Sequence, residues 1–160
     1  MLRVGTGFDS HRLVEGRPLI LGGVRIEHSR GLAGHSDADV VLHAVTDALL
    51  GAAGLGDIGD AYPDTDPANR DCDSARFVRE TLQRLGRQRW RVVNVDVTIL
   101  AQEPKLGPAK GDIRRRLADV LGVDASAVNV KAKTGERVGA IGRAEAIACH
   151  AVALIERSDN

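Results

Sequence analysis

The sequence is poor in aromatic side chains, with one tryptophan, one tyrosine and two phenylalanines among 160 residues. Proteins that bind single-stranded nucleic acid stack bases on such rings, so this class of function is disfavoured. Neither sign of charge is in excess, since 22 basic residues balance 22 acidic ones. No overall field therefore attracts nucleic acid or an anionic membrane surface, and any charged ligand must be held by a local group of side chains.

Cysteines and long apolar runs are equally scarce. Cys72 and Cys149 lie far apart and match neither a zinc-ligand spacing nor a disulfide framework, so we expect reduced thiols. No apolar run reaches the length of a membrane span, and residues 1–5 resemble neither a signal peptide nor a transit segment. These features predict a cytoplasmic protein with neither a membrane nor a nucleic-acid partner, and one domain over residues 1–160.

Strand-like and helix-like patterns alternate along the chain, which predicts an α/β (α+β) fold. We expect strands over residues 2–8, 19–26, 91–100 and 128–133, with Gly22 and Gly23 marking a bulge or a close approach. Helices are expected over residues 39–54, with Ser36 or Asp37 as the cap, over 74–85 and over 108–121. Residues 56–67 predict an exposed loop suited to a lid, and residues 145–157 fit a helix and a strand equally well.

Three residues have the chemistry and spacing of a divalent-metal site. Asp9 and His11 are two residues apart at the end of an expected strand, so both lie on one face of it. His43 adds a second imidazole from the first expected helix, where Asp39 and Asp47 lie one turn away as acceptors for its ring. Three ligands of this kind suit a zinc ion with one open position. The spacing fits equally well a helix histidine bonded to Asp47 beside ordinary polar residues at a strand end.

Other polar segments suit an anionic ligand. His35 opens the run HSDAD at the start of the first helix, where backbone N–H groups favour either an anion or simple capping. Residues 131–137 pack positive charge, a hydroxyl, glycine and Glu136 into one turn, which suits a diphosphate with a second metal and also a solvated basic turn. Residues 101–108 offer backbone groups before the third helix, and His28 and His150 are interpreted as structural.

Taken together, these motifs resemble the 2-C-methyl-D-erythritol 2,4-cyclodiphosphate synthase family over nearly the whole chain. The resemblance rests on GFDSH at 7–11, HSDAD at 35–39, HAVTDALLGA at 43–52, GDIG at 56–59, PDTDP at 63–67, NVDVT at 94–98, PK at 104–105 and NVKA at 129–132. It implies a lyase of non-mevalonate isoprenoid biosynthesis. In that reaction the 2-phosphate of 4-diphosphocytidyl-2-C-methyl-D-erythritol 2-phosphate attacks the β-phosphorus, CMP leaves, and the cyclic diphosphate forms.

The resemblance also implies an architecture and a set of site residues. The subunit would have a single-layer, four-stranded mixed sheet packed against helices, like ferredoxin and chorismate mutase, with residues 145–157 as a strand, and would form a homotrimer with sites between neighbouring subunits. Asp9, His11 and His43 would hold one Zn²⁺ per subunit, and Glu136 a Mg²⁺ or Mn²⁺ on the substrate diphosphate. The catalytic residues would be His35, Lys133, Thr134 and Glu136, and the substrate would contact Ser36, Asp57, Gly59, Asp64, Lys105, Leu106, Ala132, Lys133, Thr134 and Arg143.

Two positions depart from the family pattern. Lys133 stands where the family often has threonine, which replaces a hydroxyl contact to phosphate by an ammonium group. Ala140 stands where many members have an aromatic residue, which weakens the expectation of an isoprenoid-like ligand in the axial cavity of a trimer, while Arg143 stays available for an anion there.

Two other functions fit the same residues. A zinc hydrolase of a nucleoside diphosphate derivative would use the open metal position to activate water, although the sequence offers no evident general base. A non-catalytic nucleotide-binding module would use the same loops with a metal whose fourth position is closed by the protein.

Overall fold

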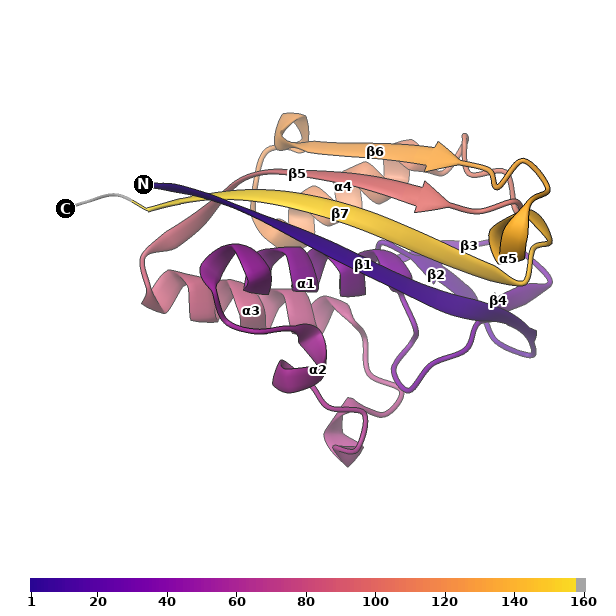
Figure 1. Cartoon of the computed structure of the whole chain (residues 1–160), viewed down its shortest axis with the longest axis horizontal. Helices are drawn as coiled ribbons and strands as arrows, with labels where there is room; N and C mark the ends of the chain where they lie inside the picture. The colour runs from indigo at the N-terminus through magenta and orange to yellow at the C-terminus, as the bar shows by residue number, and fades with distance from the viewer. Residues whose placement is uncertain (158–160) are drawn as a thin grey trace.

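The structure, a computed structural model that describes residues 1–157, contains a mixed five-stranded sheet with the order β4-β1-β7-β5-β6 (Figure 1). Its strands are β1 (Leu2–Glu15), β4 (Arg30–Leu32), β5 (Trp90–Leu100), β6 (Val128–Lys133) and β7 (Ala146–Arg157). Only β5 and β6 are parallel, and they are joined through a helix, as parallel neighbours must be. The expected number of four strands is wrong, because the three residues of β4 pair with the end of β1 and are too short to show a sequence pattern.

Three long helices lie on one face of this sheet: α1 (Val40–Ala53), α3 (Ala75–Arg87) and α4 (Lys110–Leu121) (Figure 1). The shorter helices are α2 (Ile58–Ala61) and α5 (Gly139–Gly142), with single 3₁₀ turns at η1 (Pro67–Asn69) and η2 (Ala125–Ala127). Within residues 1–157, no helix has the length and apolar character needed to cross a membrane. The expected α+β class is therefore confirmed, with the helices gathered on one side.

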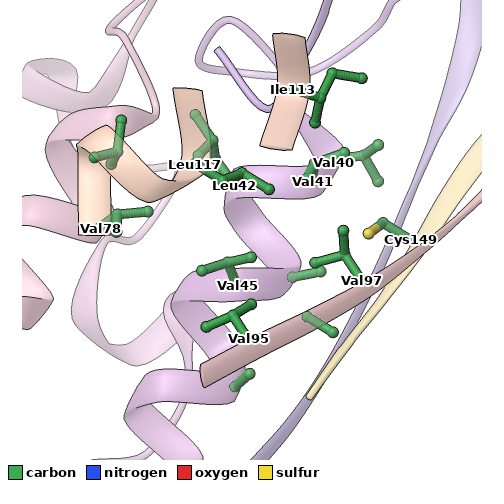
Figure 2. Close-up of a cluster of buried hydrophobic side chains, with 14 of the residues drawn as sticks. Val40, Val41, Leu42, Val45, Val78, Val95, Val97, Ile113, Leu117 and Cys149 are labelled. Carbon is green, nitrogen blue, oxygen red and sulfur yellow. The ribbon is translucent and has the colours of Figure 1, made fainter. Parts of the chain in front are cut away.

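The core fills the space between the sheet and the helices (Figure 2). Val95 and Val97 point from β5, and Cys149 from β7, because alternate residues of a strand face the same side. Val45 of α1 and Leu117 of α4 meet them from the helix layer. The alternation that predicts the strand over residues 91–100 therefore also determines which of its side chains pack against the helices.

Strand β1 and helix α1 approach unusually closely. A Cβ atom at Gly5 would lie 2.1 Å from the carbonyl oxygen of Ala48, and one at Gly7 would lie 1.9 Å from that of Ala44. Neither distance is compatible with a side chain, so glycine is required at both positions. This contact places the middle of α1 directly beside the first half of β1.

Three local expectations change in the structure. The segment expected as one strand over residues 19–26 is a hairpin of β2 (Leu19–Leu21) and β3 (Val24–Ile26), so Gly22 and Gly23, both at positive φ, form its turn rather than a bulge. The N-cap of α1 is Asp39 rather than Ser36 or Asp37. The ambiguous last segment is the strand β7. Its two-residue alternation is therefore the correct indication, and its alanine content, which favours a helix, is not.

The opposite face of the sheet carries exposed apolar side chains. Leu2, Val4 and Phe8 of β1 are more than half exposed, and Val152 of β7 is 41% exposed. Toward β5 and β6 the same face becomes polar, with an ion pair between Lys131 and Asp96.

Candidate active site

The structure brings Asp9, His11 and His43 together, as the sequence predicts. Asp9 Oδ2 lies 2.8 Å from His11 Nε2 and 2.9 Å from His43 Nδ1, and the two nitrogens are 3.1 Å apart. Asp9 and His11 point from β1 toward the helix layer, and the Gly7 contact brings α1 near enough for His43 to reach them. Three ligand atoms therefore face one point.

The triad has the geometry of a divalent-metal site. Ligand atoms around a tetrahedral zinc ion, each about 2.05 Å from the metal, are separated from one another by about 3.3 Å. The three separations in the triad are 2.8–3.1 Å, so a small outward movement of the side chains accommodates an ion. Two imidazole nitrogens and one carboxylate oxygen are also the donor types that a catalytic zinc ion prefers.

The environment of Asp9 favours the anion that a metal requires. Burial raises the pKa of Asp9, but hydrogen bonds and positive charge from His11 and His43 outweigh burial and bring the pKa well below its ordinary range. The carboxyl group is therefore a ready ligand for a cation.

The partners expected for His43 are wrong. The carboxylate of Asp39 accepts hydrogen bonds from the backbone N–H groups of Gly22, Gly23, Val41 and Leu42, so it closes the start of α1 and holds the β2–β3 turn. Asp47 accepts from Ile58 N at 2.8 Å and so fixes the start of α2. The second nitrogen of His43 instead lies 2.9 Å from Ser74 Oγ and 3.1 Å from Ser36 Oγ.

The triad lies at the wall of a cavity of about 510 Å³. Four of the residues expected at the substrate, His35, Ser36, Gly59 and Asp64, line the same cavity. His35 Nε2 is buried and has no hydrogen-bond partner among residues 1–157, so it is available to a ligand. The expected lid also contributes, since Gly59 belongs to α2 and Asp64 to the exposed turn after it.

Two expected ligand contacts are engaged elsewhere in the fold. The hydroxyl of Ser36 is only 4% exposed and lies among His43, Ser74 and the backbone N–H of Ala38. Asp57 is the N-cap of α2, accepts a hydrogen bond from Asp60 N, and is absent from the cavity wall. Its side chain therefore orders the lid segment in this arrangement.

A second group of expected residues gathers where β5 and β6 end. Ala101 N donates to Lys133 O, and Arg137 N donates to the side-chain oxygen of Gln102, so the loops after the two strands are tied together. Ala132 and Lys133 end β6, and Lys105 and Thr134 lie on the loops, whereas the side chain of Leu106 is buried in the core. Thr134 Oγ1 donates to Glu136 Oε1 at 2.7 Å, and Glu136 and Arg137 both have positive φ, a strained conformation typical of functional loops.

Arg143 directly follows α5, whose Gly142 packs against Gly135 and Arg137 of the loop after β6, and it has its own partner. Its guanidinium forms a two-point ion pair with Glu145, with separations of 2.7 and 3.2 Å. The expected free cation for an axial anion is therefore already paired within the subunit.

The metal triad and the second group, at the ends of β5 and β6, lie at the same level of the sheet but on different strands. Asp9 pairs with Cys149, Cys149 with Ile99, and Ile99 with Ala132. Three strand spacings separate Asp9 from Ala132, roughly 14 Å at about 4.8 Å each. One small phosphate group cannot touch both groups of a single subunit at once.

Sequence reasoning missed four residues that shape the cavity. Ser74 and Asp37 complete the surroundings of His43, and Tyr62 and Phe77 form an apolar wall with their rings 4.6 Å apart. The sequence shows that aromatic residues are few, and only the structure shows that Tyr62 and Phe77 pack together beside the triad.

A family model described as the YgbB family matches residues 2–156. Curated relatives named 2-C-methyl-D-erythritol 2,4-cyclodiphosphate synthase include one from Bordetella avium, 58% identical over 155 residues, which are 97% of this chain and 96% of the relative. A relative of the same name from Chromobacterium violaceum is 55% identical over 158 residues, covering 99% of this chain and all of the relative.

Solved structures agree with the sequence relatives. The bifunctional IspDF from Campylobacter jejuni has a TM-score of 0.95 and 40% identity, and the match covers 99% of this chain but only 43% of that longer chain. The CDP complex of IspF from Plasmodium falciparum has a TM-score of 0.86 and 34% identity, and covers 99% of this chain and 97% of its own.

Proposed function

The chain belongs to the YgbB family of 2-C-methyl-D-erythritol 2,4-cyclodiphosphate synthases, and on this premise we propose how its side chains perform their reaction. The enzyme converts 4-diphosphocytidyl-2-C-methyl-D-erythritol 2-phosphate to the cyclic 2,4-diphosphate and CMP. The attacking phosphate belongs to the substrate, so no protein nucleophile is required, and catalysis consists of positioning and charge stabilisation. The observation that carries the proposal is the triad of ligand atoms at the wall of a cavity that His35 and Asp64 also line.

Zn²⁺ is the ion that we assign to Asp9, His11 and His43, because the donor set and the separations suit it. When bound, it would polarise the β-phosphate and stabilise the charge that develops there. His35 would contact the same phosphate through its unpartnered Nε2. Gly59 and Asp64 would bind the methylerythritol hydroxyls, with Asp57 ordering the segment between them, and Ser36 would act from the wall of the cavity.

The second group of residues would hold the leaving nucleotide. Lys105 and the backbone of Leu106, on the loop after β5, and Ala132, near the end of β6, would line the cytidine pocket. Lys133 and Thr134 would contact the phosphates, with the ammonium group of Lys133 taking the place of a neutral hydroxyl. Glu136 would hold Mg²⁺ or Mn²⁺, which would supply positive charge to the substrate diphosphate.

We also propose that the protein is a homotrimer in which each site is shared by two subunits. The exposed strip of Leu2, Val4, Phe8 and Val152 supports an assembly through the open face of the sheet. The roughly 14 Å between the two groups within one subunit supports a site completed by a neighbour. Arg143 would then face the trimer axis as an ion pair with Glu145.

Phosphorus NMR of the pure protein with its cytidyl substrate tests the activity. The expected products are CMP and a cyclic diphosphate, with loss of turnover when a chelator is present and recovery when zinc is returned. In His43→Ala, zinc would restore nothing. Linear phosphate products would instead identify a zinc hydrolase, and unchanged substrate in metal-replete protein would contradict both enzymatic functions.

A further inference from the structure

The nitrogen of His43 that faces away from the metal centre belongs to a buried polar cluster. His43 Nε2 lies 2.9 Å from Ser74 Oγ, and Ser74 Oγ lies 2.5 Å from Asp37 Oδ1. Ser74 is fully buried at the start of α3, and Ser36, 4% exposed, lies 3.1 Å from both Ser74 Oγ and His43 Nε2. Within this cluster, Ser36 also lines the cavity, whereas Ser74 and Asp37 do not.

The direction of each hydrogen bond follows from the carboxylate. Asp37 can only accept, and it accepts from Ser74 Oγ and from Ser74 N, the latter at 3.1 Å. A serine hydroxyl has one hydrogen, so that of Ser74 is committed to Asp37. Ser74 Oγ can then only accept from His43, which requires the imidazole proton to be on Nε2.

Ser36 reinforces this arrangement. Its oxygen accepts from Ala38 N at 3.2 Å, and its single hydrogen has Ser74 Oγ as a neighbour at 3.1 Å. Ser74 Oγ would then donate once and accept twice, which is the full capacity of a hydroxyl. One of the two hydrogen bonds that Ser74 Oγ accepts comes from Ser36, and the proton on His43 Nε2 supplies the other.

The consequence appears on the other side of the ring. Once a metal replaces the ring proton that otherwise binds Asp9, an imidazole with its proton on Nε2 carries a lone pair on Nδ1, which lies 2.9 Å from Asp9 Oδ2 and 3.1 Å from His11 Nε2. Lone pairs held so close repel one another unless a cation lies between them. The serine and aspartate on one side of His43 therefore prepare the ring for a metal on the other.

We propose that Ser74, oriented by Asp37, is a positioning residue that fixes the tautomer and ring orientation of His43 and thereby sets the affinity of the triad for its divalent metal. The inference rests on the metal centre of the proposed function. Partners of this kind, behind a ligating histidine, change metal affinity by about 10–100-fold when removed. Backbone hydrogen bonds reinforce the link between the His35 segment and the residues before α3, because Asp71 N donates to His35 O and Asp37 N donates to Cys72 O.

The direct test is the ¹⁵N NMR spectrum of the zinc-loaded protein, in which the His43 ring should carry its proton on Nε2. The zinc affinity of Ser74→Ala, measured by competition with a chelator and without substrate, should be about 10–100-fold weaker than that of the unchanged protein. Asp37→Asn should weaken zinc binding less, because its amide oxygen still accepts the serine proton.

Thr81→Val is the matched control, since it removes another buried hydroxyl of α3 whose partner is the Tyr62 hydroxyl rather than His43. It should keep zinc affinity within about twofold, and Ser74→Ala should unfold in the metal-free state at a temperature close to that of this control. A proton on Nδ1 of His43, or zinc affinity of Ser74→Ala within about twofold of the unchanged protein, would overturn the proposal. Since no readout involves turnover, a failure of the synthase activity would be seen separately in the phosphorus NMR assay.

Discussion

Asp39 shows how one carboxylate can organise a site without touching a ligand. Its two oxygens accept four backbone N–H groups, two from the β2–β3 turn and two from the first turn of α1. Burial raises its pKa to about 6 against the effect of these donors, so the group is ionised at neutral pH. The carboxylate thus fixes the start of the helix that carries His43.

Asp39→Asn is expected to be strongly destabilising, because an amide has one acceptor oxygen and its NH₂ group would face a backbone donor. We expect a loss of about 3 kcal/mol in the free energy of unfolding, measured with urea. Asp124→Asn is the control, since Asp124 caps an exposed 3₁₀ turn through Ser126 N and asparagine caps equally well. Equal losses in both variants would contradict the role given to Asp39.

Burial raises the pKa of the Cys149 thiol far above its ordinary value of 9.0. The folded protein therefore keeps this proton where the unfolded chain loses it, so the contribution is present below about pH 9 and is lost as the pH rises further. We expect thiol reagents at pH 8 to modify Cys149 only after unfolding. We also expect the free energy of unfolding of Cys149→Ala to fall less steeply between pH 8 and pH 10 than that of the unchanged protein. Parallel pH profiles of the two proteins would show that the pKa of Cys149 is not raised by folding.

The sequence predicted the identity of the metal ligands but not their surroundings. Short-range periodicity places Asp9 and His11 on one strand face, and the resemblance of the surrounding motifs to the synthase family adds His43 as the third ligand. Ser74 is 31 residues from His43 along the chain and has an ordinary residue type, so only the packing of α3 against α1 reveals it. Asp39 and Asp47 do lie one turn from His43 along α1. Their carboxylates bind backbone N–H groups instead of the His43 ring, Asp39 in the first turn of α1 and Asp47 at the start of α2.

At the scale of elements, the close contact between β1 and α1 sets the position of the metal centre. We expect Gly7→Ala to cost at least about 3 kcal/mol in unfolding free energy, since its Cβ would meet the backbone of α1. The displaced helix should also weaken zinc binding, measured by chelator competition.

Gly51→Ala, a substitution in α1, provides the comparison for Gly7→Ala. Its nearest neighbour, Thr6 O, would be 3.8 Å from the new Cβ, so the methyl group fits. An alanine in a helix interior should stabilise by about 0.5–1 kcal/mol and leave zinc affinity unchanged. Similar effects of the two substitutions would show that the close approach does not control the site.

Element types were predictable wherever a strand or helix was long and its pattern unbroken, as over residues 91–100, 108–121 and 128–133. The first strand extends to Glu15, well beyond the expected residue 8, because His11 and Leu13 continue the inward alternation across a polar stretch. Strand β7 fitted both periodicities, and only its pairing with both β1 and β5 decides between them.

At the scale of the whole molecule, the separation of the two residue groups leads to a test of shared sites. His43→Ala and Glu136→Ala should each be inactive when expressed alone. Co-expressed in equal amounts, they should regain activity at about a quarter of the sites, because one metal-binding half and one nucleotide-binding half then come from different subunits in a random trimer. No recovery in mixed trimers, confirmed by mass, would place each site within one subunit.

The position of β7 in the sheet has a consequence for how the chain folds during synthesis. β7 is the last strand of the described chain, yet it lies in the middle of the sheet, between β1 and β5. When the first 145 residues have left the ribosome, every helix exists in the chain but the inner edges of β1 and β5 have no neighbour. Folding must therefore be completed after synthesis passes Arg157, and until then two open strand edges are exposed to other chains and to the chaperones that cover them.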